Sequence, residues 1–139
     1  MTLIECLVAS LVLALAASSV LVAMASALQQ QRYAEELRVA NTLAQQLLEQ
    51  VSARTFVSPS DPDFAALAAD SAMAMDGYSD TVDSMGDTAT DTTSYLRILN
   101  VSVAADAGMV QINGAGLATV TVTTPSGGTV LLQRILPGR

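Results

Sequence analysis

The side chains that could carry out chemistry in this chain are mostly acidic. The sequence has no histidine, one cysteine and 13 acidic residues against 6 basic ones, which gives a formal net charge of −7. Without histidine there is no histidine acid–base chemistry and no histidine–metal site. The sequence also lacks a glycine-rich phosphate loop and a nucleophile elbow, and nothing singles out two carboxylates as a catalytic pair. We therefore expect no enzymatic activity and no cofactor.

Aspartates recur every three or four residues in a segment rich in Asp, Thr, Ser and Gly, residues 76–94. They are Asp76, Asp80, Asp83, Asp87 and Asp91. A calcium loop needs oxygens at alternating positions, a fixed glycine and an acidic closing residue, and this spacing does not match that template. A solvated loop is the simpler interpretation, with Asp76, Asp80 and Asp83 as candidate calcium ligands. No other metal site is indicated.

The excess negative charge lies in the C-terminal part of the chain, where residues 61–139 hold nine aspartates against three arginines. An acidic surface argues against binding to nucleic acid, because phosphate backbones require clustered cations. The single cysteine, Cys6, allows no intramolecular disulfide. Since Cys6 lies in an apolar run, we expect it to act as a small hydrophobic residue, with lipidation as the alternative.

The N-terminal segment is built to lie in an apolar environment. From Cys6 to Leu28 there is no charged residue, proline or glycine, and a helix needs about 20 apolar residues to cross a bilayer. Glu5 stands at the start of this run, where a carboxylate inside the membrane costs about 2.5–3.5 kcal/mol. It should therefore lie at the membrane surface or be paired. The many Ala and Ser residues in the run would let neighbouring helices approach closely.

The stretch Met1-Thr2-Leu3-Ile4-Glu5, followed by this apolar run, resembles the N-terminus of a mature type IV pilin or type II secretion pseudopilin. Residues Ala40 to Val51 and the valine-rich C-terminus resemble most closely the minor-pilin and pseudopilin branch. In that family a prepilin peptidase cuts before the first residue, and the new N-terminus is methylated. The resemblance implies that Met1 is the processed, N-methylated end. It also implies that Glu5 pairs with the α-amino group of Met1 in a neighbouring subunit, with Thr2 bonded to the same carboxylate.

The predicted fold is α+β and type IV pilin-like, with a long helix over about residues 1–55 packed on a small antiparallel sheet of three or four strands. Residues 1–28 form the membrane or filament-core half of the helix, and residues 29–57 form its amphipathic half. Apolar residues in the second half recur at steps of four and three, which keeps them on one face. The expected buried stripe is Tyr33, Leu37, Ala40, Ala44, Leu47 and Val51, and Leu43 and Leu48 widen it.

Residues 58–94 should contain a short helix and the acidic loop. Ser58 to Pro62 predicts a turn, with Asp61 as the N-cap of a helix that runs from Pro62 to about Met75. Gly77 should end that helix.

Residues 95–139 form the predicted sheet. Alternating apolar residues indicate strands around Leu99–Val103, Gly108–Asn113, Leu117–Thr124 and Thr129–Leu136. Pro125 to Gly128 is typical of a hairpin turn. One face of this meander is free to pack on the amphipathic half of the helix.

These features favour a structural subunit that polymerises through its apolar helix into an extracellular or periplasmic type IV pilus-like filament. The expected partners are other copies of the chain, the inner membrane before assembly, the prepilin peptidase and the pilus or secretion assembly machinery. The expected location is the inner membrane, then a surface filament or a periplasmic pseudopilus. The alternative is a single-pass anchored binding module, periplasmic or extracellular, that does not polymerise.

Overall fold

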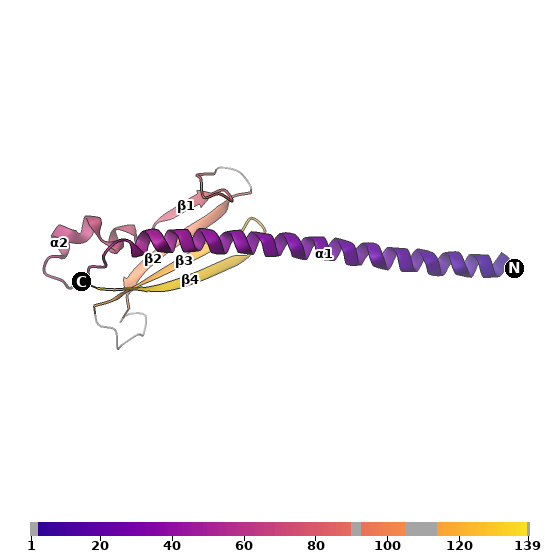
Figure 1. Ribbon diagram of the computed structural model, residues 1–139, viewed down its shortest axis with the longest axis horizontal. Coiled ribbons are helices and arrows are strands. Elements are labelled where there is room, and N and C mark those ends of the chain that lie inside the picture. Colours follow the sequence, from indigo (N-terminus) through magenta and orange to yellow (C-terminus); the bar gives the residue numbers. More distant parts are fainter. Residues whose placement is uncertain (1–2, 90–92, 105–113, 139) are drawn as a thin grey trace. The chain divides into compact units, whose positions relative to one another are not determined.

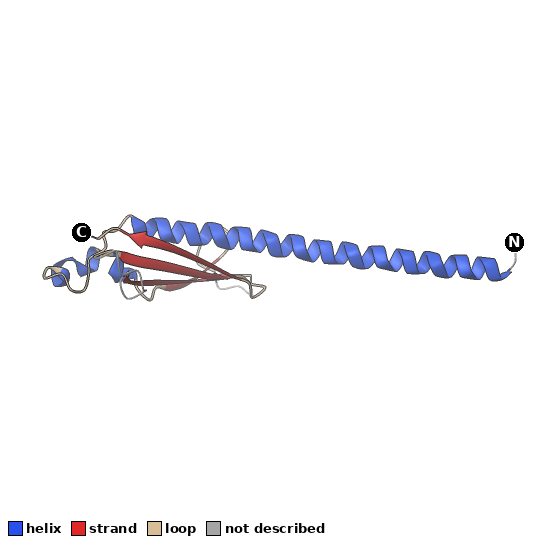
Figure 2. Cartoon of the chain, turned by 90° about the horizontal axis from the view of Figure 1, so that it is seen from below, coloured by secondary structure: helices blue, strands red, loops and turns tan. Residues whose placement is uncertain are grey.

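The computed structural model describes residues 3–89, 93–104 and 114–138 (Figure 1). The elements in chain order are α1 (Leu3–Ser52), α2 (Phe64–Leu67), two 3-10 turns η1 (Ala68–Asp70) and η2 (Ala72–Met75), β1 (Ser79–Val82), β2 (Tyr95–Val103), β3 (Gly116–Thr123) and β4 (Thr129–Leu136). The fold is α+β, with a 50-residue N-terminal helix packed against a four-stranded antiparallel sheet, as predicted (Figure 2).

Helix α1 contributes to two compact units, residues 1–35 and residues 36–139. In the second unit it buries one apolar stripe, which consists of Ala40, Leu43, Ala44, Leu47, Leu48 and Val51. This confirms the stripe predicted from Ala40 to Val51, because residues three and four apart share a helix face. Leu37, a predicted member of the stripe, is only half-buried, and Tyr33, also predicted to belong to it, is 47% exposed. Tyr33 lies in the first unit, where the helix has no other element to pack against.

The strands follow the order β1-β2-β3-β4, and every neighbouring pair is antiparallel. Buried and exposed residues alternate along β2, so that Leu99 and Val101 are buried while Asn100 and Ser102 are exposed. This alternation confirms the predicted half-buried strand. Strands β3 and β4 and the turn between them also confirm their predictions, whereas the predicted strand Gly108–Asn113 lies outside the described residues.

Strand β1 lies in a segment predicted to be a solvated loop, and for these residues that prediction is wrong. Ser79–Val82 pairs with β2, with Asp80 opposite Arg97 and Val82 opposite Tyr95. Val82 is buried, at 1% exposure. An ion pair and one buried valine therefore hold a short strand that contains an aspartate, a residue type depleted in strands.

The helix predicted from Pro62 to Met75 is also wrong, because the segment forms one short helical turn and two 3-10 turns. Ser71 interrupts it with extended backbone, φ −82° and ψ 163°. At that point the chain bonds elsewhere, since the Ala72 N–H donates to the Thr55 carbonyl at 2.9 Å. The Asp61 carboxylate accepts the Asp63 N–H at 2.9 Å, so it stabilises a turn before α2 and does not cap a helix at Pro62.

The core of the second unit lies between the stripe of α1 and the inner face of the sheet. It joins Leu43, Leu47, Leu99 and Val120, each at most 1% exposed. Phe56, which follows α1 in the chain, is fully buried and extends this core towards the start of β3.

Candidate membrane and assembly segment

The N-terminal part of α1 exposes a long apolar surface, in which Glu5 is the one charged residue before Arg32. Every residue from Leu3 to Glu35 is exposed, including Leu3 at 82%, Leu13 at 73% and Val22 at 70%. An 18-residue window of the helix has a mean hydropathy of 2.5, and none of its residues is buried. The helix is therefore long and apolar enough to cross a membrane, a property shared by membrane anchors and signal sequences.

Exposed apolar area is unfavourable in water, at roughly 25 cal/mol for each Å². Large contiguous apolar patches on a protein surface mark interaction or membrane sites. This half of α1 therefore indicates a segment that inserts into a membrane, packs against other helices, or does both in turn.

The serines of this segment are adapted to apolar surroundings. Each hydroxyl donates to the carbonyl three residues earlier, at 2.8–2.9 Å, in Ser10, Ser18, Ser19 and Ser26. A polar group that is satisfied within its own helix needs no water, which lowers the cost of placing it in lipid or in a helix bundle.

Glu5 lies in the first turn of α1 and is exposed. A carboxylate is favoured there, because the helix macrodipole places partial positive charge at the N-terminus. Met1 and Thr2, the other residues predicted to act in assembly, lie outside the described residues. Their roles, and that of Glu5, stay predictions.

The three candidate calcium ligands have separate partners in the structure. Asp76 accepts the Val101 N–H at 2.8 Å, and Asp83 accepts the Met85 N–H at 2.8 Å. Asp80 is bonded to Arg97. Within the described ranges, no group of three or more acidic or cysteine side chains is placed to hold a metal ion.

Asp80 and Arg97 form an ion pair on the inner face of the sheet, with side chains 19% and 8% exposed. Arg97 donates from Nε to Asp80 Oδ1 at 2.9 Å and from a terminal nitrogen to Oδ2. The Tyr78 hydroxyl donates to the same carboxylate at 2.9 Å. These contacts tie β1 to β2.

The pKa values of this cluster reflect those contacts. Burial acts to raise the pKa of Asp80, but the bonds from Arg97 and Tyr78 and the guanidinium charge outweigh it, so the pKa lies below its ordinary value. The hydrogen bond to Asp80, together with burial, raises the pKa of Tyr78. The carboxylate is thus held in its charged form, which suits a structural ion pair better than proton transfer at neutral pH.

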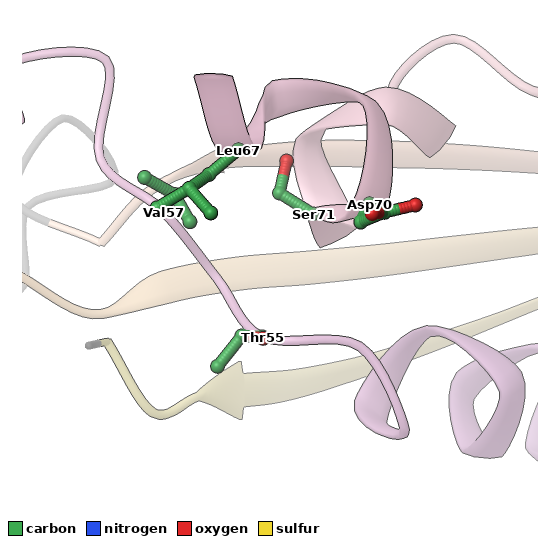
Figure 3. A pocket seen from close by; sticks show the side chains of 5 residues that line it. All are labelled: Thr55, Val57, Leu67, Asp70 and Ser71. Carbon is green, nitrogen blue, oxygen red and sulfur yellow. The ribbon is translucent and has the colours of Figure 1, made fainter. Parts of the chain in front are cut away.

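A cavity of about 390 Å³ lies beside the 3-10 turns (Figure 3). It is lined by Thr55, Val57, Leu67, Asp70 and Ser71. The Ser71 hydroxyl donates to the Ala68 carbonyl at 2.8 Å. Among the described lining residues, Asp70 has the one ionisable side chain. A single exposed carboxylate provides no acid–base pair.

Sequence reasoning missed the Asp80–Arg97 pair because its members are 17 residues apart and Asp80 was assigned to a loop. The available signal was the run Tyr78 to Val82, where Tyr, Thr and Val favour strands despite the aspartate.

Comparison of the chain with protein-family models, curated proteins and solved structures found no match. The pilin-like character of the chain therefore rests on its N-terminal motif and on its architecture, a long apolar helix packed on a four-stranded antiparallel sheet.

Proposed function

We propose that this chain is a structural subunit that polymerises through the apolar half of α1 into a type IV pilus-like filament. The observation that carries the proposal is the complete exposure of an apolar helix from Leu3 to Leu28, next to a domain that forms its own core. A membrane would cover this surface before assembly, and the helices of other subunits would cover it afterwards. The proposal gives the chain no catalytic role.

Glu5 sets the register in this proposal. In an assembled helix bundle, the α-amino group of Met1 in a neighbouring subunit would pair with the Glu5 carboxylate. The pKa of such an amino group is about 8 before perturbation, so it is cationic near neutral pH. Removing one member of a buried pair costs about 3–5 kcal/mol, which disfavours assembly without unfolding the domain.

The remaining parts of the proposal follow from this assembly. A prepilin peptidase and a pilus or secretion assembly machinery would process and extrude the subunit. It would reside in the inner membrane first, and then in a surface filament or a periplasmic pseudopilus.

The test compares Glu5→Ala with Glu35→Ala, which removes the same charge from an exposed position of the same helix. We expect filament yield in the sheared fraction to fall by about a hundredfold or more in Glu5→Ala, since each 1.4 kcal/mol is about a factor of ten. Glu35→Ala should assemble normally, and both variants should accumulate in the membrane. Normal filament yield from Glu5→Ala would contradict the assembly role of Glu5. Failure of the unmutated chain to appear in any filament would instead leave an anchored, non-polymerising module.

A further inference from the structure

The two edges of the sheet differ in how far their backbone groups are covered. At the β1 edge, the Ala89 N–H donates to the Thr81 carbonyl at 2.9 Å, and Val82 forms a bridge with Thr88. Just before β1 in the chain, the Asp76 carboxylate accepts the Val101 N–H of β2. This edge is short and occupied, which is how natural sheets block unwanted pairing.

Among the described residues, nothing pairs with the outer edge of β4 from Thr129 to Ile135, and beyond the end of the strand Phe56 forms a bridge with Gly138. The Thr124 N–H donates to the Gly128 carbonyl at 2.8 Å, so the backbone of Gly128 faces β3. In an antiparallel strand, alternate residues face opposite neighbours. The residues whose N–H and C=O groups face away from β3 are therefore Thr129, Leu131, Gln133 and Ile135. Within the part of the chain that the structure describes, these backbone groups make no hydrogen bond.

Strand β4 also lacks the usual devices that protect an edge. It contains no proline and no lysine, and its full length pairs with β3 in one unbroken register. Two of its outward residues are large and apolar, with Leu131 58% and Ile135 44% exposed. Arg134 is its only charged residue. An exposed edge of this kind is a template for another strand.

We propose that the free edge of β4 is a pairing site for the same edge of a second copy of this chain. Because the β1 edge is covered, a second copy can offer only its own β4. The contact is therefore isologous, and it closes as a dimer instead of propagating along the sheet. It joins two four-stranded sheets into one continuous antiparallel sheet.

The side chains of β4 are self-complementary when the two strands are centred on Gln133. Leu131 then lies opposite Ile135 of the second copy, so the exposed apolar side chains meet on the outer face. Arg134 lies opposite Leu132, so the two arginines do not face each other. Directly opposed apolar residues favour pairing, and opposed like charges disfavour it.

This symmetry determines where the dimer can form. The two-fold axis is perpendicular to the sheet, so residues 36–52 of the two copies run in opposite directions. Neighbours in one polar filament run in the same direction, and the contact therefore joins copies that are not neighbours in one filament. The inference goes beyond the proposed function and does not depend on assembly of the N-terminal helix.

The first experiment is disulfide trapping of the full chain in detergent, with Cys6→Ser so that an introduced cysteine is the only one. Gln133→Cys is compared with Arg134→Cys, the next residue of the same strand, which is also exposed. Opposed hydrogen-bonded residues have Cα atoms about 5.5 Å apart, within disulfide range, whereas the two copies of residue 134 would lie beyond about 7 Å. We expect Gln133→Cys to oxidise to a covalent dimer at least tenfold faster.

The second experiment is amide hydrogen exchange of the unmutated chain at low and high concentration. The N–H groups of Leu131 and Gln133 should exchange at least tenfold more slowly at high concentration, while that of Leu132, already bonded to β3, should not change. Equal oxidation of the two cysteine variants, or exchange independent of concentration, would overturn the proposal. Protection that appears only with a different protein would also overturn it, and would assign the edge to a foreign strand. Failure of the Glu5→Ala test leaves both measurements unaffected.

Discussion

The two halves of α1 form one continuous helix in contrasting surroundings. In the half that packs on the sheet, apolar residues occupy one stripe, and Leu47 is 1% exposed. In the N-terminal half apolar residues occupy every face, and Leu13 is 73% exposed. Leucine side chains are thus buried in the core in one half of the helix and exposed in the other.

Folding of a single chain therefore explains the apolar residues of the packed half of α1, but not those of its N-terminal half. A helix that is apolar all round is found in a membrane or inside a larger assembly. The folded domain also pairs its buried charge internally, through Asp80 and Arg97. The comparison therefore separates what one chain stabilises from what other molecules must supply.

The largest stability effect that would sharpen this comparison is expected from Asp80→Asn, which leaves the buried Arg97 without its anionic partner. The domain should lose about 3–5 kcal/mol of stability, measured by amide exchange of the sheet in detergent. Asp70→Asn, at an exposed position, is the matched control and should change stability by less than about 0.5 kcal/mol. Equal effects of the two variants would show that the ion pair does not hold β1.

The same pair predicts a pH dependence. Because the pKa of Asp80 in the folded state lies below its ordinary value of 3.8, the unfolded chain binds the proton more readily. The stability from ionised Asp80 is present above about pH 4, and is lost as the pH falls below 3.8 through the lower folded pKa. The difference in stability between the unmutated chain and Asp80→Asn should shrink over this range. A difference that stays constant down to pH 2 would contradict this.

A leucine-to-alanine change in each half of α1 tests the comparison itself. Leu47→Ala should destabilise the domain by about 2–5 kcal/mol, because it leaves a cavity in a packed core. Leu13→Ala should leave domain stability within about 0.5 kcal/mol, since its side chain makes no contribution to that core. Amide exchange of the sheet measures both. A large loss from Leu13→Ala would mean that the first half of the helix supports the fold.

A smaller effect is expected where the end of the helix meets the sheet. A Cβ atom on Gly116 would lie 2.3 Å from the ring of the fully buried Phe56, so Gly116→Ala should cost about 1–3 kcal/mol. Adding Phe56→Leu should reduce that cost, because the smaller side chain leaves room. A double-mutant cycle with no coupling between the two positions would contradict the contact.

The smallest effect is expected from Ser126→Ala. Glu36, at the start of the packed half of α1, accepts bonds from the Ser126 hydroxyl and from its N–H, the latter at 3.3 Å. Losing the exposed hydroxyl bond should cost about 1 kcal/mol or less. Ser84→Ala, also exposed, is the control. An equal change in stability in both variants would show that the bond to Glu36 does not stabilise the packing of α1 on the sheet.

Local sequence patterns predicted the elements in which apolar residues recur with a regular spacing. The stripe from Ala40 to Val51 followed from helical spacing, and β2 and β3 followed from alternation. The local signal for strand β1 was weak, because an aspartate stands among its strand-favouring residues, and its pairing depends on Arg97 far along the chain. The helix predicted from Pro62 failed for a similar reason, since the backbone near Ser71 bonds to Thr55.

The assembly residues show the same limit. The assembly role of Glu5 is expected from the resemblance of the N-terminal motif to pilins and stays a prediction, and the structure puts Glu5 in the first turn of α1. Its proposed partner belongs to another subunit, so neither one sequence nor one folded chain can display the pair. The open edge of β4 was likewise hidden from the sequence, because its exposure depends on the order of the strands.

The most direct measurement of the central claim is quantitative mass spectrometry of filaments sheared from cells, including the N-terminal peptide. We expect this fraction to contain the chain, with a peptide that begins at N-methylated Met1. High abundance would indicate the main subunit, and a trace amount would indicate a minor pilin or pseudopilin. Absence of the chain from the sheared fraction, together with an unprocessed N-terminus in the membrane, would contradict assembly through the apolar half of α1.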